Sequence, residues 1–133
     1  MGNRLQINQN LHDKVINFAA RKLDDKNYDI YTNPNIEKNA GIGSFYPDII
    51  LTEKGKSTVK FIIEVETIDS LNIIEATNQW KKYSTEIKCS FYLLVPYNFK
   101  NLAISLCKQI GISARFGTYK TDAYGNITEI KYE

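Results

Sequence analysis

The segment Phe91–Val95 constrains the fold more than any other, because each of its residues is apolar. A strand without a polar face has to be buried on both sides, as in the interior of a parallel or mixed sheet. Just before it, apolar residues recur at helical spacing along Leu71–Ile87, which predicts a long amphipathic helix capped by Asp69 or Ser70. A strand precedes that helix, so the two strands should form a parallel pair with a right-handed crossover.

Helix and strand patterns alternate along the rest of the chain. Apolar residues at helical spacing, after asparagines that can act as caps, predict a helix over Leu11–Leu23. A further helix is predicted over Leu102–Ile110, ending at Gly111, and the segments Asn33–Asn35 and Ile36–Ser44 should be irregular. The predicted strands are Tyr28–Thr32, Tyr46–Thr52, Thr58–Thr67, Arg115–Tyr119 and Ile127–Tyr132. Residues 1–133 are therefore expected to form a single α/β domain, with a mixed β-sheet flanked by helices.

The composition is that of an ordinary folded protein, with 43% apolar and 24% charged residues. The formal net charge is only +2, which excludes a polybasic nucleic-acid binder and leaves phosphate contacts to a local basic patch. Cys89 and Cys107 lie among apolar residues and are expected to be buried thiols. Because the N-terminus has no apolar run and no stretch is long enough to cross a bilayer, we expect a cytoplasmic protein without membrane contact.

Acidic residues stand in two neighbouring predicted strands. Asp48 follows Pro47 in the first, and Glu64 and Glu66 lie near the end of the second. Strand side chains alternate between faces, so Glu64 and Glu66 share a face, and in a hairpin Asp48 can lie opposite them. Three converging carboxylates repel one another unless a cation lies among them, and Mg²⁺ (or Mn²⁺) suits such oxygen ligands. A simpler explanation is that Pro-Asp forms a turn and Glu-Val-Glu faces water.

The predicted helix Leu71–Ile87 carries a polar stripe beside its apolar one. Gln79 and Tyr83 are four residues apart on one helical face, and Tyr83 lies where the two stripes meet. Such a pair is a weak signal alone, since a tyrosine in this position is more often a plain core residue. It gains weight only together with the acidic residues.

In their order and spacing these pieces resemble the PD-(D/E)xK nuclease superfamily, whose motif is Pro-Asp on the second strand and (Asp/Glu)-x-Lys on the third. The exonuclease branch adds Gln-x-x-x-Tyr on the following helix. The segments at these motif positions are Pro47-Asp48, Glu64-Val65-Glu66, and Gln79 to Tyr83. The resemblance covers roughly Leu11 to Val95. It implies a restriction-endonuclease-like core, in the order helix, three-stranded meander, helix, strand.

The resemblance also implies roles for the motif residues. Asp48 and Glu64 would be metal ligands, whereas Gln79 and Tyr83 would position the nucleic-acid strand or the attacking water. The third motif position departs from the family, because Glu66 replaces the usual lysine. A glutamate there would act as a base or as a further metal ligand.

A lysine elsewhere could replace the missing one. Lys82 lies three residues after Gln79 on the same helical face and is preferred to Lys60, which precedes the acidic residues on their strand. His12 and Asp13 lie on the first helix, which adds a ligand in some family members. A single histidine near a helix start is more often solvated, so His12 is expected to be a surface residue.

The implied reaction is metal-dependent hydrolysis of phosphodiester bonds in nucleic acid, with DNA as the expected substrate. Lysines that could hold the flanking backbone are Lys54, Lys56, Lys81, Lys82 and Lys88. Two alternatives stay open. One is a catalytically inactive nuclease-fold module that binds nucleic acid or a protein partner, and the other is a purely structural α/β protein. The oligomeric state also stays open, a homodimer included.

Overall fold

The computed structural model describes residues 5–34 and 38–133. The predicted irregular segments Asn33–Asn35 and Ile36–Ser44 therefore lie partly outside the described residues. Residues 1–4, which open the N-terminus, also lie outside them. Within the described ranges, no helix combines the length and the apolar character that crossing a membrane requires.

The strands of the described chain form one six-stranded mixed sheet, and their spatial order follows the sequence. They are β1 (Tyr28–Thr32), β2 (Ile49–Glu53), β3 (Val59–Val65), β4 (Ser90–Pro96), β5 (Arg115–Thr121) and β6 (Ile127–Tyr132). The first three strands form an antiparallel meander, β3, β4 and β5 run parallel, and β6 returns antiparallel to β5. The parallel pair predicted from the apolar run Phe91–Val95 is confirmed.

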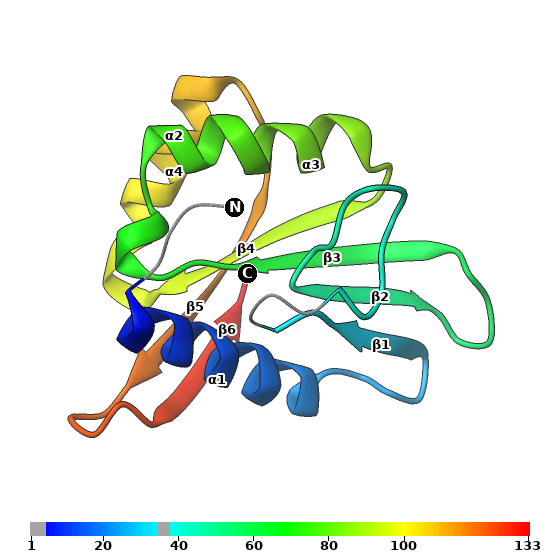
Figure 1. Cartoon of the computed structure of the whole chain (residues 1–133), viewed down its shortest axis with the longest axis horizontal. Helices are drawn as coiled ribbons and strands as arrows, with labels where there is room; N and C mark the ends of the chain where they lie inside the picture. Colours follow the sequence, from blue (N-terminus) through cyan, green and yellow to red (C-terminus); the bar gives the residue numbers. More distant parts are fainter. Residues whose placement is uncertain (1–4, 35–37) are drawn as a thin grey trace.

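Helices cover both faces of the sheet (Figure 1). They are α1 (Gln6–Lys22), α2 (Ile73–Glu75), the π-helical turn η2 (Ala76–Trp80), α3 (Lys81–Glu86) and α4 (Lys100–Ile110), with short 3-10 turns η1 (Ile68–Ser70) and η3 (Tyr97–Phe99). The first helix, α1, lies on one face, and α4 shares the other face with the continuous helical segment from α2 to α3. The mixed α/β architecture predicted from the sequence is thus confirmed.

Alternation along β3 decides which helices each side chain meets. Ile62 belongs to the core under α2–α3 and α4, together with Trp80, whereas Ile63 belongs to the core under α1. All three side chains are at most 3% exposed. Since Glu64 continues the row of Ile62, its side chain is directed toward the α2–α3 layer.

The starts of α1 and β2 move furthest from their predicted positions, because the loops and exposed turns around them carry little periodic signal. The helix α1 begins at Gln6, with Leu5 as an N-cap residue that makes no side-chain cap, so the asparagines predicted as caps lie inside the helix. Its first turns are exposed, and apolar spacing marks only the buried part of a helix. The strand β2 begins at Ile49 rather than at Tyr46, which leaves Asp48 immediately before the strand.

The predicted cap of the second long helix was also wrong. Asn72 caps α2, with its side chain accepting the Glu75 N–H at 2.9 Å. Ser70 is occupied elsewhere, because its hydroxyl accepts the Thr67 N–H and donates to the Thr67 carbonyl across η1. The 3-10 turn thus intervenes between β3 and the helix, and the cap moves toward the C-terminus. At the end of α4, Gly111 adopts a φ of 72° as the predicted C-terminal cap.

Asn33 fixes the loop that leads into β2. Its side-chain amide donates to the carbonyls of Ala40 and Pro47, both at 2.7 Å, and its Oδ1 accepts the N–H groups of Asn39 and Ala40. The Asn33 backbone N–H donates to the Asp48 carbonyl at 2.9 Å. This 3%-exposed residue therefore ties the start of the loop to its end and sets where Asp48 enters the sheet.

We expect Asn33→Ala to destabilise the fold by roughly 2–4 kcal/mol, because it leaves several partly buried backbone groups without partners. Urea denaturation measures the loss. Asn101 lies exposed on α4, and Asn101→Ala should change stability by less than about 0.5 kcal/mol. Equal stabilities of the two variants would show that the Asn33 bonds do not hold this loop.

Candidate functional site

Asp48 and Glu64 meet at the end of the sheet where β2 begins and β3 ends. The register pairs Ile49 with Ile63, which sets Asp48 opposite Glu64, and the Asp48 N–H donates to Oε1 of Glu64 at 3.2 Å. Asp48 is 4% exposed, Glu64 2% and Glu66 0%. The simpler explanation, in which Glu-Val-Glu faces water, is therefore wrong.

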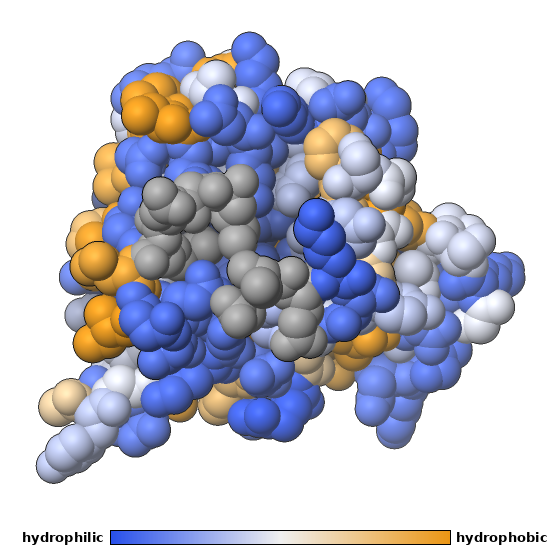
Figure 2. Space-filling model, viewed as in Figure 1, coloured by the Kyte–Doolittle hydropathy of each residue, from blue (hydrophilic) through white to orange (hydrophobic). Residues whose placement is uncertain are grey.

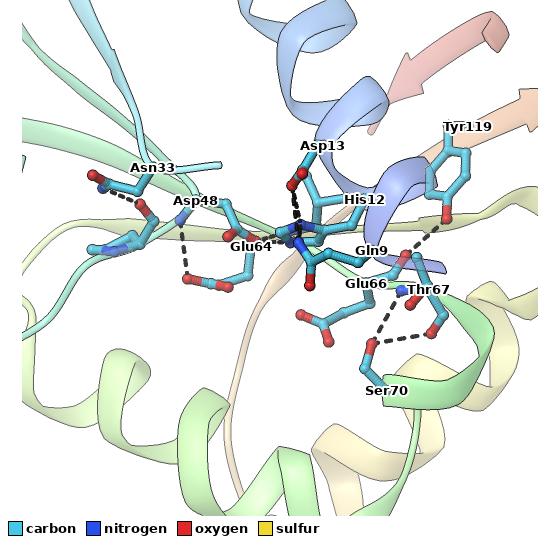
Figure 3. Close-up of polar contacts among 12 residues, drawn as sticks. Gln9, His12, Asp13, Asn33, Asp48, Glu64, Glu66, Thr67, Ser70 and Tyr119 are labelled. Carbon is cyan, nitrogen blue, oxygen red and sulfur yellow. Dashed lines mark hydrogen bonds and ion pairs between the residues drawn. The ribbon is translucent and has the colours of Figure 1, made fainter. Parts of the chain in front are cut away.

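The Asp48 carboxylate joins three elements, as the close-up of the polar contacts shows (Figure 3). Its Oδ2 accepts the Val65 N–H of β3 at 2.8 Å and lies 3.0 Å from Nε2 of His12 on α1. With the proton on Nε2, the imidazole donates to the carboxylate. Donors from two different elements fix the orientation of one Asp48 oxygen at the junction of α1, β2 and β3.

His12 is the residue of this site that the sequence analysis placed wrongly. It was expected at the surface, yet it is 0% exposed. Its Nδ1 lies 3.2 Å from Oδ1 of Asp13, which also accepts from the Gln9 amide at 3.0 Å. The signal was present in the sequence, because His12 precedes Val15 and Ile16 at helical spacing and so belongs to the buried face of α1.

Glu66 lies just beyond the end of β3, and its backbone is held on both sides. Its N–H donates to the Leu94 carbonyl at 2.9 Å, which continues the pairing of β3 with β4. Its carbonyl accepts the Tyr119 hydroxyl of β5 at 2.9 Å. In Figure 3 the carboxylates of Glu64 and Glu66 lie on the same side of this strand. The expected sharing of one face by the two glutamates therefore holds.

The environment strongly favours the protonated form of Glu64. Burial raises the pKa of Glu64 well above its ordinary value of 4.5, and the charges of Asp48 and Glu66 raise it further. The three carboxylates are thus close enough to interact through the protein interior. A cation among them would favour the ionised form and reverse this shift.

Gln79, Lys82 and Tyr83 line one cavity next to this acidic cluster. Burial raises the pKa of Tyr83, and the Glu64 charge raises it as well, whereas a hydrogen bond with Gln79 lowers it. The π-helical turn η2 contains Gln79 and ends one residue before α3 begins. Such turns are rare in proteins, and those that occur are often found at functional sites. Gln79 and Tyr83 therefore lie on one wall of the same cavity, and Tyr83 is near enough to Glu64 to feel its charge.

Two of the lysines expected to hold nucleic-acid backbone lie elsewhere. Lys54 and Lys56 occupy the turn between β2 and β3, at the end of the hairpin opposite Asp48 and Glu64. Lys54 pairs with Asp29 at 3.2 Å, and Lys56 lies 3.4 Å from its own carboxylate partner, Glu53. Of the lysines expected to contact nucleic acid, Lys82 lines the cavity near the acids. Lys54 and Lys56 lie away from the acids because the turn of a hairpin and its open strand ends are separated by the length of the strands.

The donor chemistry at the strand ends suits a hard divalent cation, since carboxylate oxygens are the ligands that Mg²⁺ and Mn²⁺ prefer. Among the described residues, however, no three His, Cys, Asp or Glu side chains are already converged as a ligand set. One Asp48 oxygen is engaged by His12 and Val65, so Asp48 would offer its other oxygen to an ion. Glu64 and Glu66 would complete the set.

Comparison of the chain with protein-family models, curated proteins and solved structures finds no match. A functional assignment therefore rests on the residues of the site.

We expect Glu64→Gln to stabilise the protein in the absence of divalent cations at about pH 8. The raised pKa means that folded Glu64 keeps its proton where unfolded Glu64 has lost it. Glu64 therefore lowers the stability of the wild type as the pH rises above 4.5, and the neutral variant lacks this contribution. Thermal unfolding in EDTA measures this, with each 1 kcal/mol appearing as roughly 4 °C.

The difference between the two proteins should shrink toward zero below about pH 4.5, where both side chains are neutral in both states. Glu86 is exposed on α3, and Glu86→Gln should leave the unfolding temperature nearly unchanged at either pH. A Glu64→Gln protein that is less stable than the wild type at pH 8 would contradict the raised pKa.

Proposed function

We propose that the chain is a metal-dependent nuclease that hydrolyses phosphodiester bonds, with DNA as its substrate and Mg²⁺ or Mn²⁺ as its cofactor. The observation that carries the proposal is the buried cluster of Asp48, Glu64 and Glu66, in which burial and neighbouring charges raise the Glu64 pKa. Buried charges cost free energy, and a purely structural strand has no need to gather them. Ionisable groups perturbed in this way are frequent at functional sites.

The order of elements supports the same proposal. A helix, an antiparallel meander of β1, β2 and β3, a helix and the parallel strand β4 follow one another, as in the restriction-endonuclease-like core. The Pro-Asp dipeptide stands just before β2, and Glu64 stands near the end of β3. These are the positions at which that core carries its acidic motif residues.

Each site residue has a role in the proposed reaction. A divalent ion held by Asp48, Glu64 and Glu66 would polarise a phosphate oxygen and lower the pKa of water. His12 holds the Asp48 carboxylate in place through its hydrogen bond. Tyr83 bounds the cavity through which a nucleic-acid strand would approach the acids.

Lys82 is proposed to supply the positive charge of the family's lysine. It lines the cavity together with Gln79 and Tyr83, and its exposed side chain can reach a phosphate there. Gln79 would orient the strand by hydrogen bonding. Glu66 then takes the role of a ligand or of a base for the attacking water.

A second candidate function is favoured by the same departure from the family pattern. Position 66 holds a glutamate where the family has lysine. If catalysis is lost with that lysine, the protein is an inactive nuclease-fold module that binds nucleic acid or a protein partner, a second copy of itself included. Dependence of cleavage on a divalent ion separates the two functions.

The proposal places the protein in the cytoplasm. Cys89 and Cys107 are both free, which agrees with a reducing compartment, but only Cys107 is buried as expected and Cys89 is half-buried. Burial raises the pKa of the Cys107 thiol to about 11, so that it stays protonated and unreactive.

We expect the wild type to cleave labelled single- or double-stranded DNA with Mn²⁺ or Mg²⁺ and not with EDTA. Glu66→Gln should lower the rate by about 10²–10⁴-fold, the usual contribution of a positioned acid–base group. Glu66→Lys should not restore activity, because Lys82 already supplies the cation. Gel-based cleavage rates measure all three proteins.

Glu86→Gln serves as the matched control, since it neutralises an exposed carboxylate on α3 and should cleave like the wild type. The inactive-module function predicts a different pattern. The wild type would then be inert with every ion, Glu66→Gln would bind Mn²⁺ equally well, and Glu66→Lys would gain activity. That pattern would overturn the nuclease proposal.

A further inference from the structure

A cavity of about 330 Å³ lies between the loop before β2 and the helical segment α2–α3. Its walls include Phe45 from the loop and Glu75, Gln79, Lys82 and Tyr83 from the helices. A volume of this size is at the lower end of the range for small-molecule pockets, roughly 300–1,000 Å³. Gln79, Lys82 and Tyr83 have roles in the proposed reaction, whereas Phe45 and Glu75 have none.

The cavity lies near the acidic cluster, although the acids do not line it. Phe45 stands three residues before Asp48 on the same short loop. On the helical wall, the charges of Glu64, Asp48 and Glu66 raise the pKa of Tyr83. A nucleotide whose phosphate lies at the acids would therefore have its neighbouring base at this cavity.

Phe45 offers the aromatic wall that a base requires. Its ring is half-buried and packs edge-to-face against Tyr83, with ring centroids 5.4 Å apart. This contact fixes the Phe45 ring at the cavity wall. Stacking of a base on an aromatic side chain is a general way to hold single-stranded nucleic acid.

Glu75 is the feature that selects a kind of base. It lines the cavity and is only 8% exposed, yet within residues 5–34 and 38–133 its carboxylate makes no hydrogen bond or ion pair. Its own N–H is capped by Asn72, so the backbone around it is fixed. The Glu75 carboxylate can therefore accept hydrogen bonds from donors of whatever occupies the cavity.

The surface around the helices suits a polar ligand. Figure 2 shows a mostly hydrophilic surface on this side of the molecule, with apolar groups gathered mainly toward the left edge. Lys82 is exposed at the cavity wall, where it can pair with a phosphate. The cavity thus combines an aromatic face, a carboxylate acceptor and a cation.

We propose that this cavity binds one unpaired guanine of the nucleic-acid strand, stacked on Phe45 and held through its Watson–Crick edge by Glu75. This inference rests on the proposed function for the placement of the strand. Guanine is the standard base with two adjacent N–H donors on that edge, N1–H and the exocyclic amine, and these match the two oxygens of a carboxylate. In a duplex the same edge is occupied, so the base has to be unpaired.

The test is fluorescence anisotropy of labelled single-stranded oligothymidine that carries one central guanine, inosine or adenine, in EDTA so that no cleavage occurs. Inosine lacks only the exocyclic amine of guanine. The wild type should bind the guanine strand roughly tenfold more tightly than the inosine strand, since one charge-assisted hydrogen bond is lost. It should discriminate at least as strongly against adenine and against the same sequence in a duplex.

Variants assign the preference to residues. Glu75→Gln should bring the guanine and inosine affinities to within about twofold of one another, because the pair of acceptors is gone. Phe45→Leu keeps apolar volume against Tyr83 but removes the aromatic face, and it should weaken every single strand by roughly tenfold. Glu86→Gln and Tyr124→Leu alter an exposed carboxylate and an 88%-exposed ring elsewhere, and they should bind like the wild type.

Equal affinities of the wild type for guanine, inosine and adenine strands would overturn the inference, whatever the variants do. A guanine preference that survives Glu75→Gln would overturn it as well. Parallel cleavage assays with Mn²⁺ keep this result separate from the proposed function. Guanine-selective binding without cleavage would leave the base site in place and remove the nuclease. Cleavage without guanine preference would support the nuclease and overturn the base site.

Discussion

The candidate site depends on the contacts of the Asp48 carboxylate. One oxygen of this side chain accepts from the β3 backbone and from the imidazole of His12, and thereby joins α1 to the end of the meander. Asn33 fixes the loop that delivers Asp48, and Glu64 accepts the Asp48 N–H from the neighbouring strand. Phe45 precedes Asp48 by three residues on the same loop and forms part of the cavity wall.

The junction has a cost in free energy. Burying Glu64 beside two other acids raises its pKa, so the folded state holds a proton there that an ion would replace. A fold selected for stability alone would place an apolar or amide side chain at this position. Polar groups that reduce stability in this way are expected at functional sites, because they do not help the chain to fold.

Sequence periodicity predicted the architecture because each element carries its own pattern. The apolar run Phe91–Val95 lies within the parallel strand β4, and the predicted hairpin placed Asp48 opposite Glu64. What could not be predicted depends on contacts between distant segments. His12 meets its carboxylate partner across 36 positions of the chain, and Asn33 bonds to Pro47 across 14. The π-helical turn η2, likewise, has no recognised signal in the local sequence.

The central claim is that the buried acids bind a divalent cation in exchange for a proton. Calorimetric titration with Mn²⁺ near pH 7, repeated in buffers of different ionisation enthalpy, counts the protons released on binding. The account predicts binding with release of about one proton per ion, and Glu64→Gln should abolish that release. Absence of Mn²⁺ binding, or binding whose proton release is unchanged in Glu64→Gln, would contradict it.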